Sequence, residues 1–151
     1  RIRKLTKDIL EIRPDIILTH WMNDPINTDH ETAGKAVFRA VSAAGMRGAL
    51  PATDPHFIPD IFLFETTIPH SEFNRFRIDT FIDITEVFKQ KMEAVSQFRV
   101  QPQLMDYYTD SAKSRGFQAT DWSRGRGNIT YAEVFYHYTP FLGKELPLSV
   151  V

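Results

Sequence analysis

The sequence predicts an α/β fold with a Rossmann-like, mostly parallel sheet and flanking helices. Short β-branched runs, which are typical of buried strands, alternate with stretches whose apolar residues recur at helical spacing. These elements follow one another in the order helix, strand, helix, strand, strand, helix, which is typical of α/β domains. Polar, turn-rich segments separate them and mark the expected loops.

The first helix is expected over residues 1–12, where the apolar positions at helical spacing are Ile2, Leu5, Ile9 and Ile12. Pro14 cannot continue a helix, so it ends this one. The β-branched run at residues 15–19 then predicts a buried strand, and we expect its neighbour to run parallel to it.

The second helix is expected to begin after a polar loop at residues 20–27. Thr28 and Glu31 have the spacing of a capping box, in which the threonine accepts from the backbone N–H of the glutamate. An apolar stripe of small residues follows, and Gly45 is expected to end the helix.

The remaining elements are read in the same way. We expect a second buried strand at residues 60–65 and a third ending at residues 83–85, with loops at 46–59 and 66–76. Helices are expected from Val87 to about Phe98 and from Leu104 to Gly116, and residues from Phe117 onward are expected to form an irregular tail.

Composition and charge exclude several classes of function. The formal net charge of −1 gives no electrostatic reason to bind nucleic acid or an acidic membrane. The 151 residues include no cysteine, so a bound metal would be held by His, Asp and Glu. No apolar run is long enough for a membrane span. We therefore expect a cytoplasmic protein without nucleic-acid partners, and its oligomeric state is left open.

The segment most suggestive of chemistry lies between the first predicted strand and the second predicted helix. In open α/β sheets, ligands bind beyond the carboxyl ends of the strands. His30 is expected in the first helical turn, where its imidazole could reach that crevice and suit zinc or a similar divalent ion. From the residues alone, a histidine beside an acid at a helix start is more often a capping or surface feature.

Three motifs resemble those of the LmbE / PIG-L family of metal-dependent N-deacetylases. N-T-D-H at residues 27–30, followed by A-G-K-A-V, resembles the family's second motif. D-I-T at 83–85, with Lys91 and S-Q downstream, resembles its strand and the helix that follows. Y-A-E-V-F at 131–135 resembles the segment near its C-terminal end. The three matches occur in the family's order.

The resemblance implies a zinc-dependent hydrolase that removes an N-acetyl group from an amino sugar or a related acyl-amine, with Zn²⁺ or another divalent metal as cofactor. The family's first motif, A-H-P-D-D-E, carries two metal ligands and the general base, and it is absent from this sequence. Residues 1–151 would then be the C-terminal part of a single deacetylase domain, with a sheet incomplete at the N-terminal side.

The resemblance also implies roles for particular residues. His30 would be a metal ligand. Asn27, which replaces a histidine of the family motif, would donate to the oxyanion. Asp29 would orient His30 or a neighbouring backbone group; the equally weighted alternative is an acid favoured by the helix dipole.

Substrate contacts are assigned to Trp21, whose indole could stack on a sugar ring, and to the loop at 66–76. Trp21 could equally serve as half-buried packing. Arg126, in the S-R-G-R-G stretch at 123–127, could meet an anionic group of the substrate. For Glu133 we favour a structural role over one that lines the site.

Two alternatives remain open at this point. The chain could be a non-catalytic carbohydrate-binding member of the family that holds no metal, or an α/β domain of another hydrolase class. The substrate, the preferred metal and the whereabouts of an A-H-P-D-D-E segment, upstream or on another chain, are likewise open.

Overall fold

The computed structural model describes residues 1–51, 53–58, 60–66, 74–145 and 147. They belong to two compact units. Unit 1 comprises Arg1–Asp79 with Phe135–Leu142, and unit 2 comprises Thr80–Val134 with Gly143–Val151. The strands form one open sheet in the order β1-β2-β4-β3, and β4 (Ala132–His137) runs through both units. The predicted α/β class is confirmed.

Unit 1 begins with the predicted helix, strand and helix: α1 (Ile2–Ile12), β1 (Ile16–His20) and α2 (Thr28–Ala44). Strand β2 (Asp60–Phe64) pairs with β1 in parallel, as predicted, and the register places His20 opposite Phe64. The second half of β4 joins the other side of β2 in antiparallel pairing.

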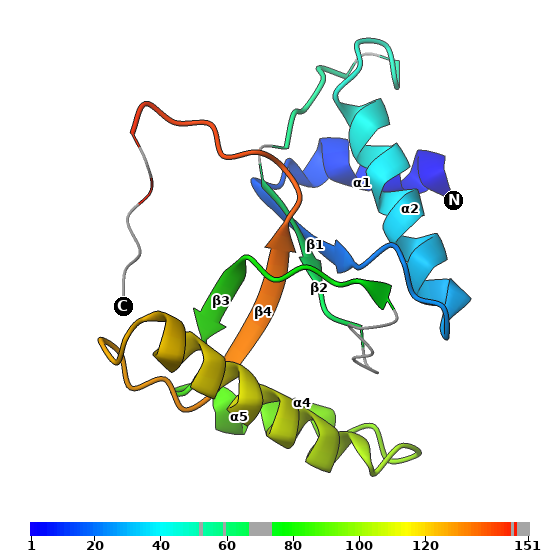
Figure 1. Ribbon diagram of the computed structural model, residues 1–151. Coiled ribbons are helices and arrows are strands. Elements are labelled where there is room, and N and C mark those ends of the chain that lie inside the picture. The colour runs from blue at the N-terminus through cyan, green and yellow to red at the C-terminus, as the bar shows by residue number, and fades with distance from the viewer. Residues whose placement is uncertain (52, 59, 67–73, 146, 148–151) are drawn as a thin grey trace. The chain divides into compact units, whose positions relative to one another are not determined.

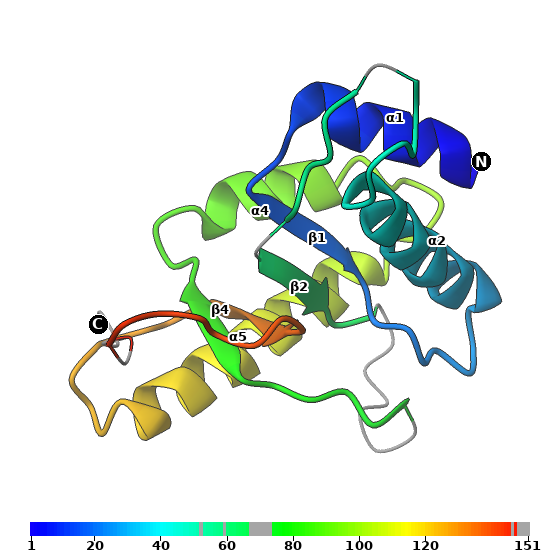
Figure 2. The ribbon, with the colours of Figure 1, turned by 90° about the horizontal axis from the view of Figure 1, so that it is seen from above.

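Helices α1 and α2 lie together on one side of β1 and β2 (Figures 1 and 2). The sheet contributes to a shared core through alternate residues, because successive side chains of a strand point to opposite faces. The core residues are Ile9, Leu10, Ala40, Ala44, Ile58, Ile61 and Leu63. Alanines on α2 let the helix approach α1 and the strands closely.

The expectation that the first strand is buried was wrong for one of its faces. Thr19 is buried and Ile17 packs on the core, but Ile16 and Leu18 are 56% and 58% exposed. The reason is position: β1 is at the edge of the sheet, and both described helices of its unit lie on the other face. A β-branched run therefore does not distinguish a strand buried on both faces from one buried on a single face.

The predicted capping box at the start of α2 was also wrong. The N-cap is Asn27, one residue earlier than expected, and its side chain makes no capping hydrogen bond. The His30 N–H instead donates to the Asn27 carbonyl at 3.0 Å. Helix α2 does end at Ala44, immediately before Gly45, as expected.

Unit 2 contains β3 (Thr80–Asp83), α4 (Phe88–Val95), α5 (Leu104–Trp122) and the first half of β4. Helix α4 packs beside α5, which also contacts β3 (Figure 1). Two expectations for this region were wrong: α5 continues six residues past Gly116, and the segment assigned to an irregular tail holds a strand. None of the described helices is long and apolar enough to span a membrane.

Gly116 explains the first of these errors. A Cβ atom at this position would lie 2.3 Å from the Thr130 carbonyl oxygen, so the glycine permits backbone contact between α5 and the segment that leads into β4. Thr120 reinforces that contact, because its hydroxyl bonds both the N–H and the carbonyl of Ile129 at 3.2 Å. The glycine is needed for packing and does not stop the helix.

Candidate functional site

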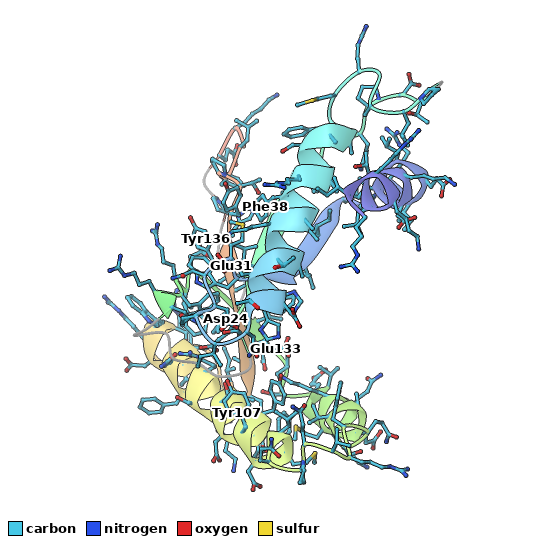
Figure 3. The ribbon with its side chains drawn as sticks, turned by 90° about the vertical axis from the view of Figure 1, so that its right-hand side faces the viewer. Asp24, Glu31, Phe38, Tyr107, Glu133 and Tyr136 are labelled. Atoms are coloured by element: carbon cyan, nitrogen blue, oxygen red, sulfur yellow. The ribbon has the colours of Figure 1, made fainter. Side chains whose placement is uncertain are left out.

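A buried carboxylate lies in the loop between β1 and α2. Asp24 is 5% exposed. Its Oδ1 accepts from the backbone N–H groups of Ile26 at 3.0 Å and Asn27 at 2.9 Å, and its Oδ2 is 2.8 Å from Nδ1 of His30. Figure 3 shows Asp24 beside the N-terminal end of α2. The loop thus folds around one side chain, which fixes both the approach to α2 and the ring of His30.

Burial alone would raise the pKa of Asp24, but its hydrogen bonds with the Asn27 N–H, His30 and the Ile26 N–H outweigh this and lower the pKa. The carboxylate is therefore ionised at neutral pH and can only accept. Nδ1 of His30 must carry the proton in this contact, which leaves the lone pair of the neutral imidazole on Nε2. Nε2 has no hydrogen-bond partner among the described residues.

A second histidine lies against the first. The ring of His20, at the end of β1, stacks on that of His30 with 4.8 Å between the centroids, and Phe64 covers it at 4.6 Å. Burial lowers the pKa of His20, and the neighbouring His30 lowers it further, whereas Asp24 acts in the opposite direction. His20 is consequently held neutral at neutral pH.

The contact between α2 and β1 that brings the two histidines together depends on Gly34. A Cβ atom there would lie 2.8 Å from the His20 carbonyl oxygen and 3.1 Å from Cγ of Met22. The glycine in the A-G-K-A-V sequence that follows N-T-D-H thus has a structural role: it lets α2 approach the end of β1.

The other side of the loop is held by a tryptophan and an asparagine. The Trp21 indole N–H and the Asn23 amide both donate to the Asn74 carbonyl, each at 2.8 Å. The Trp21 ring makes edge contacts with Phe76 at 5.3 Å and Tyr136 at 5.7 Å. The packing interpretation of Trp21 accounts for these contacts, and its role in binding substrate stays a prediction.

The structure separates the predicted site residues. His30 and Asn27 lie in the loop–helix junction with Asp24. Asp29 is exposed in the first turn of α2, as its helix-dipole interpretation expects, and the carboxylate in contact with the His30 ring is that of Asp24. Sequence reasoning missed Asp24 and His20. The available signal was that both lie in the polar stretch at residues 20–27 that follows a predicted strand.

Arg126 and Glu133 belong to unit 2. Arg126 is exposed in the turn after α5 and donates from Nε to the Ser123 carbonyl at 3.1 Å, so its contact with substrate stays a prediction. Glu133 pairs with Lys91 at 2.6 Å, and the Lys91 ammonium lies 5.2 Å from the centroid of the Tyr108 ring. This pairing accords with the structural interpretation of Glu133. Most of the loop at 66–76 lies outside the described residues.

The D-I-T and Y-A-E-V-F motifs are in contact within unit 2. The Thr85 hydroxyl accepts from the N–H groups of Thr130 at 3.1 Å and Tyr131 at 3.2 Å. The Asp83 carboxylate in turn accepts from the Thr85 N–H at 2.8 Å. These two motifs therefore fasten the end of β3 to the start of β4.

No three His, Asp or Glu side chains in the described part of the chain are placed to enclose a metal ion. One ligand nevertheless has the right form. A metal-binding histidine commonly donates its second ring N–H to a carboxylate, which fixes the tautomer and the ring orientation. His30 has this arrangement with Asp24, and its Nε2 fits a single position in the coordination of a divalent ion.

No family model matches the chain. The chain is 36% identical over 128 residues to 4-oxalmesaconate hydratase of Pseudomonas putida KT2440. The aligned region covers 81% of this chain and 47% of that relative. Its structure matches that of GalB, the 4-carboxy-2-hydroxymuconate hydratase of the same bacterium, with a TM-score of 0.89 and 31% identity, over 97% of this chain and 61% of that one.

N,N'-diacetylchitobiose deacetylase of Pyrococcus horikoshii also matches, with a TM-score of 0.57 and 21% identity, over 92% of this chain and 55% of that one. The chain has the fold of these enzymes. It spans about half the length of the curated hydratase and three fifths of the solved one. The expected α/β fold is thus confirmed, and the two relatives above at 36% and 31% identity are named as hydratases, not as deacetylases.

Proposed function

We propose that the protein containing this chain is a hydratase that adds water to a carbon–carbon double bond of an unsaturated polycarboxylate. The observation that carries the proposal is the 36% identity to 4-oxalmesaconate hydratase across 81% of the chain. The structural match to GalB at a TM-score of 0.89 supports it over nearly the whole chain. Both relatives are named for unsaturated acids with several carboxylates.

Hydration of a conjugated double bond has two demands. A water molecule must lose a proton as its oxygen attacks the carbon, and the negative charge that moves onto the conjugated carbonyl or carboxylate must be stabilised. Afterwards the neighbouring carbon takes up a proton. The residues at the junction of β1 and α2 are suited to both demands.

His30 would hold a divalent metal through Nε2, and Asp24 would keep the ring in the required tautomer. Zn²⁺, when bound, lowers the pKa of its water and polarises an adjacent oxygen. The stacked ring of His20 restricts rotation of His30. Asn27, half-buried at the helix start, would donate its side-chain amide to the developing oxyanion.

An N-deacetylase acting on an amino sugar or a related acyl-amine is the second candidate. The resemblance of residues 27–30 to the LmbE / PIG-L motif favours it. The same residues would serve, since amide hydrolysis also needs an activated water and an oxyanion donor. The two candidates therefore differ in the substrate, and the means of activating water is common to both.

The test incubates the protein containing this chain with two substrates in parallel. 4-Oxalmesaconate is followed by the loss of ultraviolet absorbance from its conjugated double bond, and N,N'-diacetylchitobiose by the release of acetate. We expect absorbance to fall and no acetate to appear. Acetate release without a change in absorbance would overturn the hydratase in favour of the deacetylase, and the absence of both would overturn both.

Two histidine variants test the site itself. His30→Ala should abolish turnover and remove bound metal, measured as zinc per chain by elemental analysis. His137→Gln is the matched control, because His137 pairs with Asp60 at 2.8 Å and takes no part in the Asp24 loop. Stoichiometric zinc in His30→Ala would contradict the assignment of His30 as a ligand.

A further inference from the structure

The short segment from Asn74 to Arg77 is fixed against the loop that carries Asp24. Asn74 is 2% exposed. Its carbonyl accepts from the side chains of Trp21 and Asn23, each at 2.8 Å, and Asn23 directly precedes Asp24. Its own amide group donates to the Thr66 hydroxyl at 3.3 Å. These three hydrogen bonds hold the segment next to the candidate site.

Two arginines project from this segment on either side of a buried ring. Phe76 is 8% exposed and packs edge-on against Trp21 at 5.3 Å. Its N–H donates to the Asn74 side chain at 2.9 Å, and Arg75 between them has a φ of 54°. Because the Phe76 ring is turned into the unit, the flanking Arg75 and Arg77 are both exposed to solvent.

Arg77 is also oriented by an aromatic ring. Its guanidinium carbon lies 5.3 Å from the centroid of Tyr136, and that ring touches Trp21 at 5.7 Å. The Arg77 guanidinium donates no hydrogen bond to another described residue, so its N–H groups can bind a carboxylate with two parallel hydrogen bonds. Trp21 thus connects the loop of Asp24 with the residues that position Arg77.

Neither arginine has an acidic partner among the described residues. Two unpaired cations on the segment that is bonded to the Asp24 loop attract anions. We propose that Arg75 and Arg77 bind the carboxylate groups of the substrate and so select a polycarboxylate over a neutral sugar. This inference rests on the proposed hydratase function and deepens it by assigning the residues that recognise substrate.

The binding test uses mesaconate, a small unsaturated dicarboxylate, and its neutral dimethyl ester, titrated calorimetrically into the protein containing this chain. The variants are Arg75→Gln and Arg77→Gln. Arg39→Gln is the matched control, because Arg39 is an exposed arginine of the same unit and lies about 13 Å further along α2 than His30. Melting temperatures verify that each variant is folded.

We expect each site variant to weaken mesaconate binding by at least about tenfold, as expected for loss of a bidentate, charge-assisted contact. Arg39→Gln should bind like the wild type, and the ester should not bind. With 4-oxalmesaconate as substrate, KM should rise in both site variants while kcat changes little, because the arginines bind substrate without taking part in the chemistry.

The outcomes separate the two proposals. Unchanged dissociation constants and KM values in both site variants overturn the carboxylate assignment, even if the wild type proves to be a hydratase. Equal weakening in Arg39→Gln also overturns it, since a general loss of positive charge would then explain the effect. If Arg75→Gln and Arg77→Gln lose the mesaconate binding of the wild type, but the wild type shows no hydratase turnover, carboxylate recognition is supported and the proposed reaction is overturned.

Discussion

Replacing Asp24 with asparagine tests whether this one carboxylate organises the junction between β1 and α2. Asparagine has nearly the same shape, so the change removes the charge and keeps the volume. The amide oxygen can still accept from the Ile26 and Asn27 N–H groups. The amide nitrogen, in contrast, would face Nδ1 of His30 as a donor.

The magnitude follows from the three hydrogen bonds. A bond to a charged group contributes about 1.5–3 kcal/mol and a neutral one about 0.5–1.5 kcal/mol, so exchanging three charged bonds for neutral ones, with donor and acceptor reversed in the bond to His30, costs about 3–4.5 kcal/mol. In a chain of this size, each kcal/mol lowers the melting temperature by about 2–4 °C, which gives a fall of about 10 °C.

The assay combines thermal unfolding at pH 7 with nitrogen NMR of the His30 ring. We expect the wild type to carry its ring proton on Nδ1. In Asp24→Asn the proton should move to Nε2, which removes the lone pair that would bind a metal. The control is Asp29→Asn, because Asp29 is exposed in the first turn of the same helix and has only its interaction with the helix dipole, about 0.3–1 kcal/mol, to lose.

Two results would refute this reasoning. If Asp24→Asn melted at the wild-type temperature, the carboxylate would not organise the loop. If Asp29→Asn changed the His30 tautomer and Asp24→Asn did not, the orienting acid would be the one expected from the sequence.

Two further predictions concern the histidine stack and α5. Because the pKa of His20 is lower in the folded than in the unfolded protein, the unfolded chain binds a proton more readily. The free energy of unfolding should therefore fall as the pH drops below about 6.5. With chelator present, the melting temperature of His20→Gln should fall less than that of the wild type as the pH is lowered from about 7 to about 5. Equal slopes of melting temperature against pH for the two proteins would contradict this prediction. Gly116→Ala should cost about 1–3 kcal/mol, because its Cβ meets the Thr130 carbonyl. Gly45→Ala, whose Cβ has no contact below 3.7 Å, is the control, and equal denaturation midpoints for the two would contradict the packing argument.

Local periodicity was sufficient for the elements that fold by local rules. Helix α1 begins and ends where its apolar spacing and Pro14 indicated. Strand β1 was found as a β-branched run, and β2 as a short apolar run. Strand β4 was missed because its inward residues include the small Ala132, which is 1% exposed but adds little apolar signal. Alternation of Ala132, Val134 and Tyr136 was the pattern that could have found it.

The candidate site was only half predictable. His30 carries the motif resemblance, so sequence reasoning selected it. Asp24 reaches it from six residues away through a non-repeating loop, and no spacing rule predicts such a contact. His20 joins the cluster because α2 approaches the end of β1 at Gly34, which is a property of tertiary packing.

The exposed face and outer edge of β1 bear on how the isolated chain behaves in solution. This edge strand has no charged side chain while His20 is neutral. Among the described strands, only β2 pairs with it. Free backbone groups beside exposed Ile16 and Leu18 form a template for edge-to-edge association. The apparent mass measured by light scattering should therefore rise with protein concentration. Leu18→Lys, which places a charge on that strand, should suppress this rise without disturbing the core on the opposite face.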